Sequence, residues 1–284
     1  LWLFEGFTSY YDDLVLMRGD IYSESEYYNI VESNIERTVN QPGNTIQPVA
    51  EASFDAWIKF YRPNENRHNS TVSYYTKGSV IANMMDLIII HETKGKRSLD
   101  DVMKLLYEKY QHEPDFGITE ENVQQLFLSA TGVNMDWFFR DHIYGTEPIA
   151  YEKYLAYAGI EAMRTDGHRR QHGFTGARFE KKRNSYEVTR VDRNSPAWRA
   201  GLNVGDEVQE LNGEPADDLP ALLDNLMPGD EAAFIVERMG QQYIIEMTTT
   251  KDPAISLELQ PLEKPSAAQK KVHDLWMGRK VVID

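Results

Sequence analysis

The sequence contains no cysteine in its 284 residues. Disulfides and thiolate metal sites are therefore excluded, and the absence fits the cytoplasm and the periplasm equally, so it assigns no compartment. Long apolar runs are also missing, because the run from Leu87 to Ile90 is far too short to span a bilayer. We therefore expect no membrane association, and any signal peptide would precede Leu1.

Basic residues are scarce relative to acidic ones. The chain has 30 Lys and Arg against 45 Asp and Glu, which gives a formal net charge of −15. Such a surface repels phosphate backbones, so we expect no nucleic-acid partner. The apolar content of 41% is sufficient for packed cores, and a chain of this length favours two domains.

The first 160 residues have the pattern of a mainly helical domain. A capping box at Ser23 and caps at Ser98 and Thr119 predict three helix starts. A long helix is expected over Lys77–Thr93. The stretch 40–69 is rich in Pro and Asn, so it is expected to be mostly loop.

The first helix combines an apolar stripe with one acidic face. Leu3, Phe7 and Tyr10 recur at helical spacing, and the stripe continues beyond them. Glu5 lies on a different face of the same helix. Because a carboxylate in a buried helix is costly to desolvate, Glu5 requires either a cationic side chain or a metal ion. The residues alone leave both interpretations open.

From about residue 173 the pattern changes to strands. Tyr186–Val191, Ala232–Arg238 and Gln242–Thr248 have strand character, and a tight turn over 239–241 joins the last two in a hairpin. The phrase Ser-Pro-Ala-Trp-Arg-Ala-Gly-Leu-Asn-Val-Gly-Asp, which begins at Ser195, predicts a short helix that ends at Gly201.

That phrase resembles PDZ domains of the bacterial protease type. PDZ domains add a peptide to a sheet edge and hold its terminal carboxylate in a loop. The resemblance places that loop at Gly173, Phe174, Thr175 and Gly176, so a C-terminal peptide in the PDZ groove is an expected partner. The alternative is a PDZ domain that serves only as a rigid packing module.

The opening phrase Trp-Leu-Phe-Glu-Gly-Phe-Thr-Ser-Tyr-Tyr, which contains Glu5, resembles the third-ligand helix of the glycyl aminopeptidase family. These zinc peptidases have a thermolysin-like catalytic domain and a PDZ domain. The resemblance makes Glu5 a Zn²⁺ ligand. Related peptidases often carry an acid four residues later, which orients a histidine ligand. Ser9 occupies that position here, and Asp12 is the alternative for this role.

The phrase Ser-Tyr-Tyr-Thr-Lys-Gly resembles the motif in which related zinc aminopeptidases supply a catalytic tyrosine. The match gives this role to Tyr75, with Tyr74 as the local competitor. A neutral phenol can donate a hydrogen bond to the oxyanion that forms during peptide hydrolysis. An aromatic packing pair at a helix start is the structural alternative.

The sequence also lacks His-Glu-x-x-His, the motif that would supply the other zinc ligands. His168 and His172 are the only histidines four residues apart, and Arg169 stands where the motif has Glu, so a loop is expected there. The resemblance puts the true histidine pair in an N-terminal remainder of the same protein. We therefore expect this chain to be the C-terminal part of an enzyme and to be inactive alone.

The predicted fold class is α+β with two domains: the mainly α-helical C-terminal half of a thermolysin-like catalytic domain, then a PDZ β-sandwich or barrel with two helices. The expected boundaries are 1–160 for the helical part, 161–252 for the PDZ domain, and 253–284 for a linker and C-terminal helix. The predicted function is zinc-dependent hydrolysis of N-terminal residues such as Gly or Ala from peptide substrates. The alternative is a non-catalytic PDZ protein that binds peptides.

Overall fold

The computed structural model describes residues 1–113, 115–165, 172–183 and 185–278. His168 lies outside the described residues, whereas His172 lies in a bend. Helices build the first part of the chain: α1 (Phe4–Arg18), α2 (Glu24–Val39), η1 (Pro42–Thr45), α3 (Val49–Phe54), η2 (Ala56–Phe60), α4 (Arg67–Ser70), α5 (Thr76–Glu92), α6 (Leu99–His112), α7 (Glu120–Thr131), α8 (Asp136–Phe138), η3 (Phe139–Ile143) and α9 (Tyr151–Tyr157).

Strands predominate in the remainder, which ends in a helix: β1 (Ile160–Thr165), β2 (Ala177–Lys181), β3 (Tyr186–Val191), α10 (Pro196–Ala200), β4 (Glu207–Leu211), β5 (Glu214–Pro215), η4 (Ala216–Asp218), α11 (Leu219–Asp224), β6 (Glu231–Arg238), β7 (Gln241–Thr248), β8 (Ser256–Pro261) and α12 (Ala267–Trp276). The predicted α+β fold class is confirmed. None of the described helices is both long and apolar enough to cross a bilayer.

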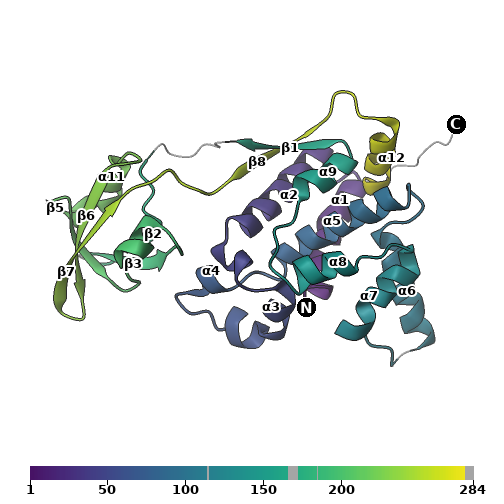
Figure 1. Ribbon diagram of the computed structural model, residues 1–284, viewed down its shortest axis with the longest axis horizontal. Coiled ribbons are helices and arrows are strands. Elements are labelled where there is room, and N and C mark those ends of the chain that lie inside the picture. Colours follow the sequence, from purple (N-terminus) through teal and green to yellow (C-terminus); the bar gives the residue numbers. More distant parts are fainter. Residues whose placement is uncertain (114, 166–171, 184, 279–284) are drawn as a thin grey trace.

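The described residues form two parts, each with its own hydrophobic core. One core lies among the helices and includes Leu257 and Trp276 from the end of the chain. The other lies between the sheet and its two helices α10 and α11. We call the elements around the first core, including β1, β8 and α12, the helical part, and β2 to β7 with their helices the sheet part. Figure 1 shows the two parts joined by the β1–β8 ribbon.

The sheet is antiparallel, with strand order β2-β3-β4-β6-β7, and β5 pairs with β4. The predicted hairpin is present as β6 and β7, with Met239 and Gly240 at positive φ in its turn. The short helix α10 is capped by Ser195 and ends at Gly201, whose φ of 84° is readily adopted by glycine. The expected strands and caps of the sheet part are thus confirmed.

Helix α5 is the centre of the helical part. Every residue from Lys77 to Ile90 is buried, so this helix is covered on all sides. Helices α1, α2, α6, α9 and α12 all pack on it. The predicted starts of α2, α6 and α7 are confirmed, because the side chains of Ser23, Ser98 and Thr119 each accept a hydrogen bond from the first helical turn.

Two segments differ from expectation. The stretch 40–69 contains short helical turns as well as loop, and Val49, Ala50 and Ala56 from these turns pack on the core despite the Pro and Asn content. The segment after Pro253, expected to be a linker, contains β8, which pairs with β1 from Ile160↔Pro261 onward. Leu257 and Leu259 alternate with polar residues and face the helical core, which explains the strand.

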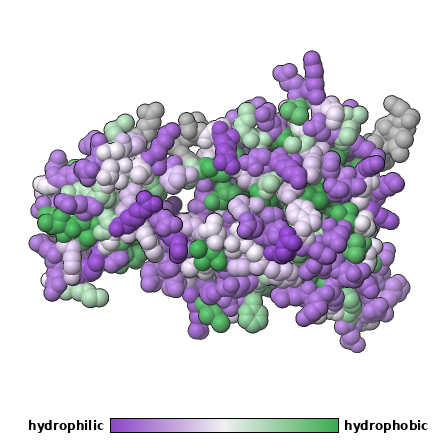
Figure 2. Space-filling model, in the orientation of Figure 1, coloured by the Kyte–Doolittle hydropathy of each residue, from purple (hydrophilic) through white to green (hydrophobic). Residues whose placement is uncertain are grey.

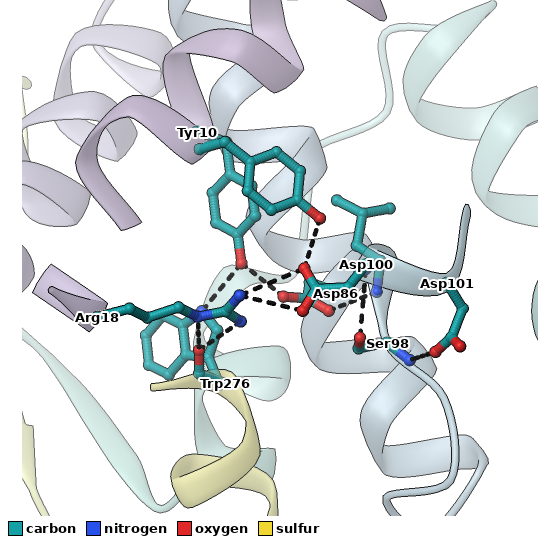
Figure 3. Close-up of polar contacts among 9 residues, drawn as sticks. Tyr10, Arg18, Asp86, Ser98, Asp100, Asp101 and Trp276 are labelled. Atoms are coloured by element: carbon teal, nitrogen blue, oxygen red, sulfur yellow. Dashed lines mark hydrogen bonds and ion pairs between the residues drawn. The ribbon is translucent and has the colours of Figure 1, made fainter. Parts of the chain in front are cut away.

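A buried carboxylate holds four helices together (Figure 3). Asp86 of α5 is fully buried and accepts hydrogen bonds from the Tyr10 hydroxyl of α1 at 2.6 Å and from the Leu99 amide of α6 at 2.8 Å. Trp276 of α12 donates from its indole nitrogen to the Tyr10 hydroxyl at 3.2 Å. The C-terminal helix is thereby tied to the centre of the helical part.

Arg18 of α1 extends the same network. Its guanidinium pairs with Asp100 of α6 at 3.1 Å and donates to the Trp276 carbonyl at 2.9 Å. Tyr11 donates to the same Asp100 at 2.9 Å. Each buried polar atom named here therefore has a partner, which is what makes a buried polar network tolerable.

The network makes stability depend on pH. Burial raises the pKa of Asp86 to about 6, against the opposing hydrogen bonds from Leu99 and Tyr10. Below about pH 4 the carboxyl is neutral in both folded and unfolded chains, and above pH 6 the folded chain must bury a charge. Between these values the free energy of unfolding should fall by about 3 kcal/mol on account of Asp86.

Asp86→Asn should remove this contribution, because an amide does not titrate. Urea unfolding of the wild type and the variant at pH 4 and pH 7 measures the change. From pH 4 to pH 7, the free energy of unfolding of the wild type should fall by about 2–3 kcal/mol relative to that of the variant. Asp217→Asn, on an exposed turn, is the control. Parallel pH profiles for wild type and Asp86→Asn would contradict the assignment.

Candidate active site

Helices α1 and α5 cross at two glycines. A Cβ on Gly6 would lie 2.5 Å from the Cα of Gly78, and a Cβ on Gly78 would lie 2.8 Å from the Trp2 carbonyl oxygen. No side chain fits between the backbones, so only glycine permits this approach. Glu5 directly precedes Gly6 on α1, and Tyr75 lies three residues before Gly78 at the start of α5, so both residues flank the crossing.

The negative charge of Glu5 acts on Tyr75. Tyr75 is half-buried, and its hydroxyl lies 3.4 Å from that of Tyr61. The hydrogen bond with Tyr61 raises the pKa of Tyr75, and the negative charge of Glu5 raises it further. Glu5 is itself half-buried, and within the described residues its carboxylate has no hydrogen bond or ion pair.

Three tyrosine hydroxyls meet at the start of α5. Tyr74 donates to the Tyr61 hydroxyl at 3.1 Å, and the bonds from Tyr74 and Tyr75 lower the pKa of Tyr61. The rings of Tyr74 and Tyr75 stack at 4.7 Å, and Trp57 stacks on Tyr61 at 4.8 Å. Tyr74 is buried, whereas Tyr75 is accessible, so of the two only Tyr75 is placed to reach a substrate.

The two polar residues that follow Glu5 on α1 have different surroundings. The Ser9 hydroxyl donates to the Glu5 carbonyl at 2.8 Å, one turn back, which occupies its proton. Asp12 is exposed and lines a separate apolar groove between α1 and α6. For both Ser9 and Asp12, the role of orienting a metal ligand stays a prediction.

The Glu5 carboxylate fits the requirements for one of the ligands of a zinc site. A half-buried carboxylate without a cationic side chain beside it suits a divalent ion. Among the described residues no group of three His, Cys, Asp or Glu side chains could hold a metal. Since protein zinc sites use three or four ligands, Glu5 would have to be joined by ligands from outside the described residues.

The predicted PDZ loop lies before β2. The amides of Gly173 and Phe174 donate to the carbonyls of Leu226 and Thr250, which fixes the loop against the end of α11 and the segment after β7. Gly176 has φ of 78°, and its carbonyl accepts from the Asp192 amide at 2.7 Å. The amides of Thr175 and Gly176 have no acceptor among the described residues, and both residues are buried, so the role of the loop in binding a carboxylate stays a prediction.

Sequence reasoning missed Tyr61. Its hydroxyl is the centre of the tyrosine cluster, and it ends the aromatic segment that runs from Phe54 through Trp57. Trp57 is 75% exposed, which is unusual for so large an apolar side chain. The sequence shows that this segment is aromatic. The contact between Tyr61 and Tyr75, however, depends on the turn of η2.

Comparison with known proteins shows what each part of the chain is similar to. Residues 1–81 match the M61 glycyl aminopeptidase family, and residues 187–238 match the PDZ domain. The crystal structure of an aminopeptidase N family protein from Idiomarina loihiensis is similar over 98% of this chain, with a TM-score of 0.82 and 27% sequence identity. The chain covers 48% of that structure, so it spans about half the length of this relative.

Two curated proteins are similar over a shorter stretch. Both are described as probable periplasmic serine endoprotease DegP-like. The one from Ectopseudomonas mendocina is 37% identical over 75 residues, 25% of this chain and 16% of the relative. The one from Pseudomonas fluorescens is 35% identical over 80 residues, 27% of this chain and 17% of the relative.

The helical part is therefore similar to aminopeptidases, and it is joined to a PDZ domain. The predicted resemblance to the glycyl aminopeptidases with a PDZ domain is confirmed. The comparisons support a peptidase, and the PDZ domain indicates peptide binding.

The glycine crossing can be tested by adding one methyl group. Gly78→Ala should lower the free energy of unfolding by about 1–3 kcal/mol, because the new Cβ meets the backbone of α1. Gly117→Ala is the matched control, since nothing lies within 4 Å of its Cβ position. Urea unfolding measures both, and equal stability of the two variants would show that the helices separate easily.

Proposed function

We propose that this chain is the C-terminal part of a zinc-dependent aminopeptidase that removes N-terminal residues such as Gly or Ala from peptides. The observation that carries the proposal is the Glu5 carboxylate next to the α1–α5 crossing, whose negative charge acts on the Tyr75 phenol. It is supported by the match of residues 1–81 to the glycyl aminopeptidases. The remaining zinc ligands would belong to an N-terminal remainder of the same protein.

In this proposal Glu5 is the one zinc ligand supplied by the chain. Zinc, when bound, acts as a Lewis acid and lowers the pKa of a water molecule, which supplies a nucleophile at neutral pH. A carboxylate ligand adds negative charge without closing the site. The half-burial of Glu5 limits competition from bulk water for its oxygens.

Tyr75 would stabilise the oxyanion that develops on the peptide carbonyl. The hydrogen bond with Tyr61 and the charge of Glu5 both raise the pKa of Tyr75, so the phenol keeps its proton at neutral pH. A protonated phenol can donate to an oxygen that gains charge, and a hydrogen bond that strengthens in the transition state increases kcat. Trp57 and Tyr61 form an aromatic wall beside it.

Tyr75→Phe in the complete enzyme should lower kcat by about 100-fold and leave the zinc content unchanged, because only the transition-state hydrogen bond is lost. Hydrolysis of Gly and Ala p-nitroanilides measures kcat, and elemental analysis measures zinc. Tyr107→Phe, an exposed phenol on α6, is the control. Unchanged turnover in Tyr75→Phe would remove this residue from the mechanism.

Glu5→Gln tests the metal ligand separately. In the complete enzyme the neutral amide should weaken zinc affinity by about 100-fold or more, since a charged ligand is replaced by a poor one. Competition with a zinc chelator gives the affinity without any assay of activity. Glu108→Gln, an exposed acid on α6, should bind zinc as the wild type does. Equal affinity in both variants would refute the role of Glu5.

The coding sequence that precedes Leu1 provides a further test. A His-Glu-x-x-His motif there would supply the two histidine ligands and the general base that the proposal requires. An upstream sequence without such a motif would favour the non-catalytic, peptide-binding alternative.

A further inference from the structure

A cleft of about 890 Å³ lies between the helical part and the sheet part. The end of α2, His68 of α4 and Thr76 of α5 line one side, and β2, β3 and the start of α10 line the other. Asn69 bridges the two parts at the cleft: its amide nitrogen donates to the Val191 carbonyl, and its amide oxygen accepts from the Arg193 backbone, both at 2.8 Å.

Cations dominate the lining of this cleft, although the chain as a whole carries a net charge of −15. Five of them have no hydrogen bond or ion pair from their side chains to described residues: Arg37, Arg178, Arg193, Arg199 and Lys251. A sixth, Arg190, pairs with Asp192 at 2.8 Å. The acids in the lining are Asp192 and Asp252, so positive charge is in excess. Figure 2 shows hydrophilic residues on both sides of this junction.

The excess charge acts on the groups within the cleft. Burial lowers the pKa of His68, and the positive charges of Arg190 and Arg178 lower it further, against the effect of Asp192. Burial also lowers the pKa of Arg190, and Arg178 contributes to that decrease. One carboxylate close to Arg190 therefore does not neutralise the cleft, and an anionic ligand would relieve the repulsion.

The shape of the sheet part favours a peptide as that ligand. Strand β2 is at an edge of the sheet, paired only with β3 in the described topology, so its other side can accept an added strand. The loop Gly173–Gly176 directly precedes β2, and Phe174 of that loop lines the cleft. Arg178 lies on β2 itself. A peptide added to this edge therefore runs beside the cations.

We propose that this cleft selects acidic peptide segments, with the peptide backbone added to β2 and its Asp and Glu side chains set against cations from both parts of the molecule. The proposal goes beyond general peptide binding by a PDZ domain, because Arg37 of the helical part contributes to the selection. It does not depend on zinc or on peptidase activity.

Fluorescence anisotropy with the 284-residue chain tests the proposal. One labelled peptide carries several Glu residues before a free apolar C-terminus, and its partner carries Gln at the same places. The acidic peptide should bind more tightly, and its affinity should fall as salt is added. The double variant Arg178→Gln, Arg193→Gln should bind the acidic peptide about tenfold more weakly. Loss of each exposed charge should reduce the affinity by up to about fivefold.

Arg62→Gln combined with Arg183→Gln is the matched control, since it removes the same charge from exposed residues outside the cleft lining. Circular dichroism verifies that each variant is folded. Equal affinity for the Glu and Gln peptides, or an equal loss in the control variant, would overturn the proposal. Displacement of the acidic peptide by a short single-stranded RNA at equal concentration would overturn it as well, because any polyanion would then suffice.

Discussion

The contact between Gly6 and Gly78 is the constraint on which the rest of the molecule depends. Because neither residue has a Cβ, the backbones of α1 and α5 touch, and a methyl group on either glycine would force them apart. The two residues proposed to act in catalysis flank these glycines, Glu5 on one helix and Tyr75 on the other. A side-chain interface between the same helices would place the carboxylate and the phenol further apart. The glycines thus set the geometry of the candidate site.

A second constraint keeps that crossing at one angle. Asp86 lies on the same buried helix as Gly78 and accepts from Tyr10 of α1, while Trp276 of α12 donates to the same hydroxyl. A packed apolar interface tolerates sliding by small repacking, but a satisfied buried network has one good arrangement. The desolvation that raises the pKa of Asp86 is the cost of this specificity. The last helix of the chain therefore helps to orient a site built from the first.

Local signals in the sequence predicted much of the fold, and tertiary effects account for the rest. The capping residue Ser98 acts through neighbouring backbone amides, so a short window suffices to recognise it. Strand β8 alternates Leu257 and Leu259 with polar residues, but its partner β1 lies almost 100 positions away in the sequence. A motif singled out Tyr75, whose role stays a prediction, whereas the contact of Tyr61 with Tyr75 depends on a turn that no motif announces. The sequence could not predict the excess of cations in the cleft, because the composition as a whole is acidic and the cations come from distant segments.

Thr76 lies between the candidate active site and the cationic cleft. It lines the cationic cleft, and it directly follows Tyr75 in the first turn of α5. A peptide in the cleft would therefore contact the turn that orients the tyrosine hydroxyl. Helix α5 is buried along most of its length, so movement at this end would be confined to that turn. The Gly6–Gly78 contact fixes α5 one turn further along.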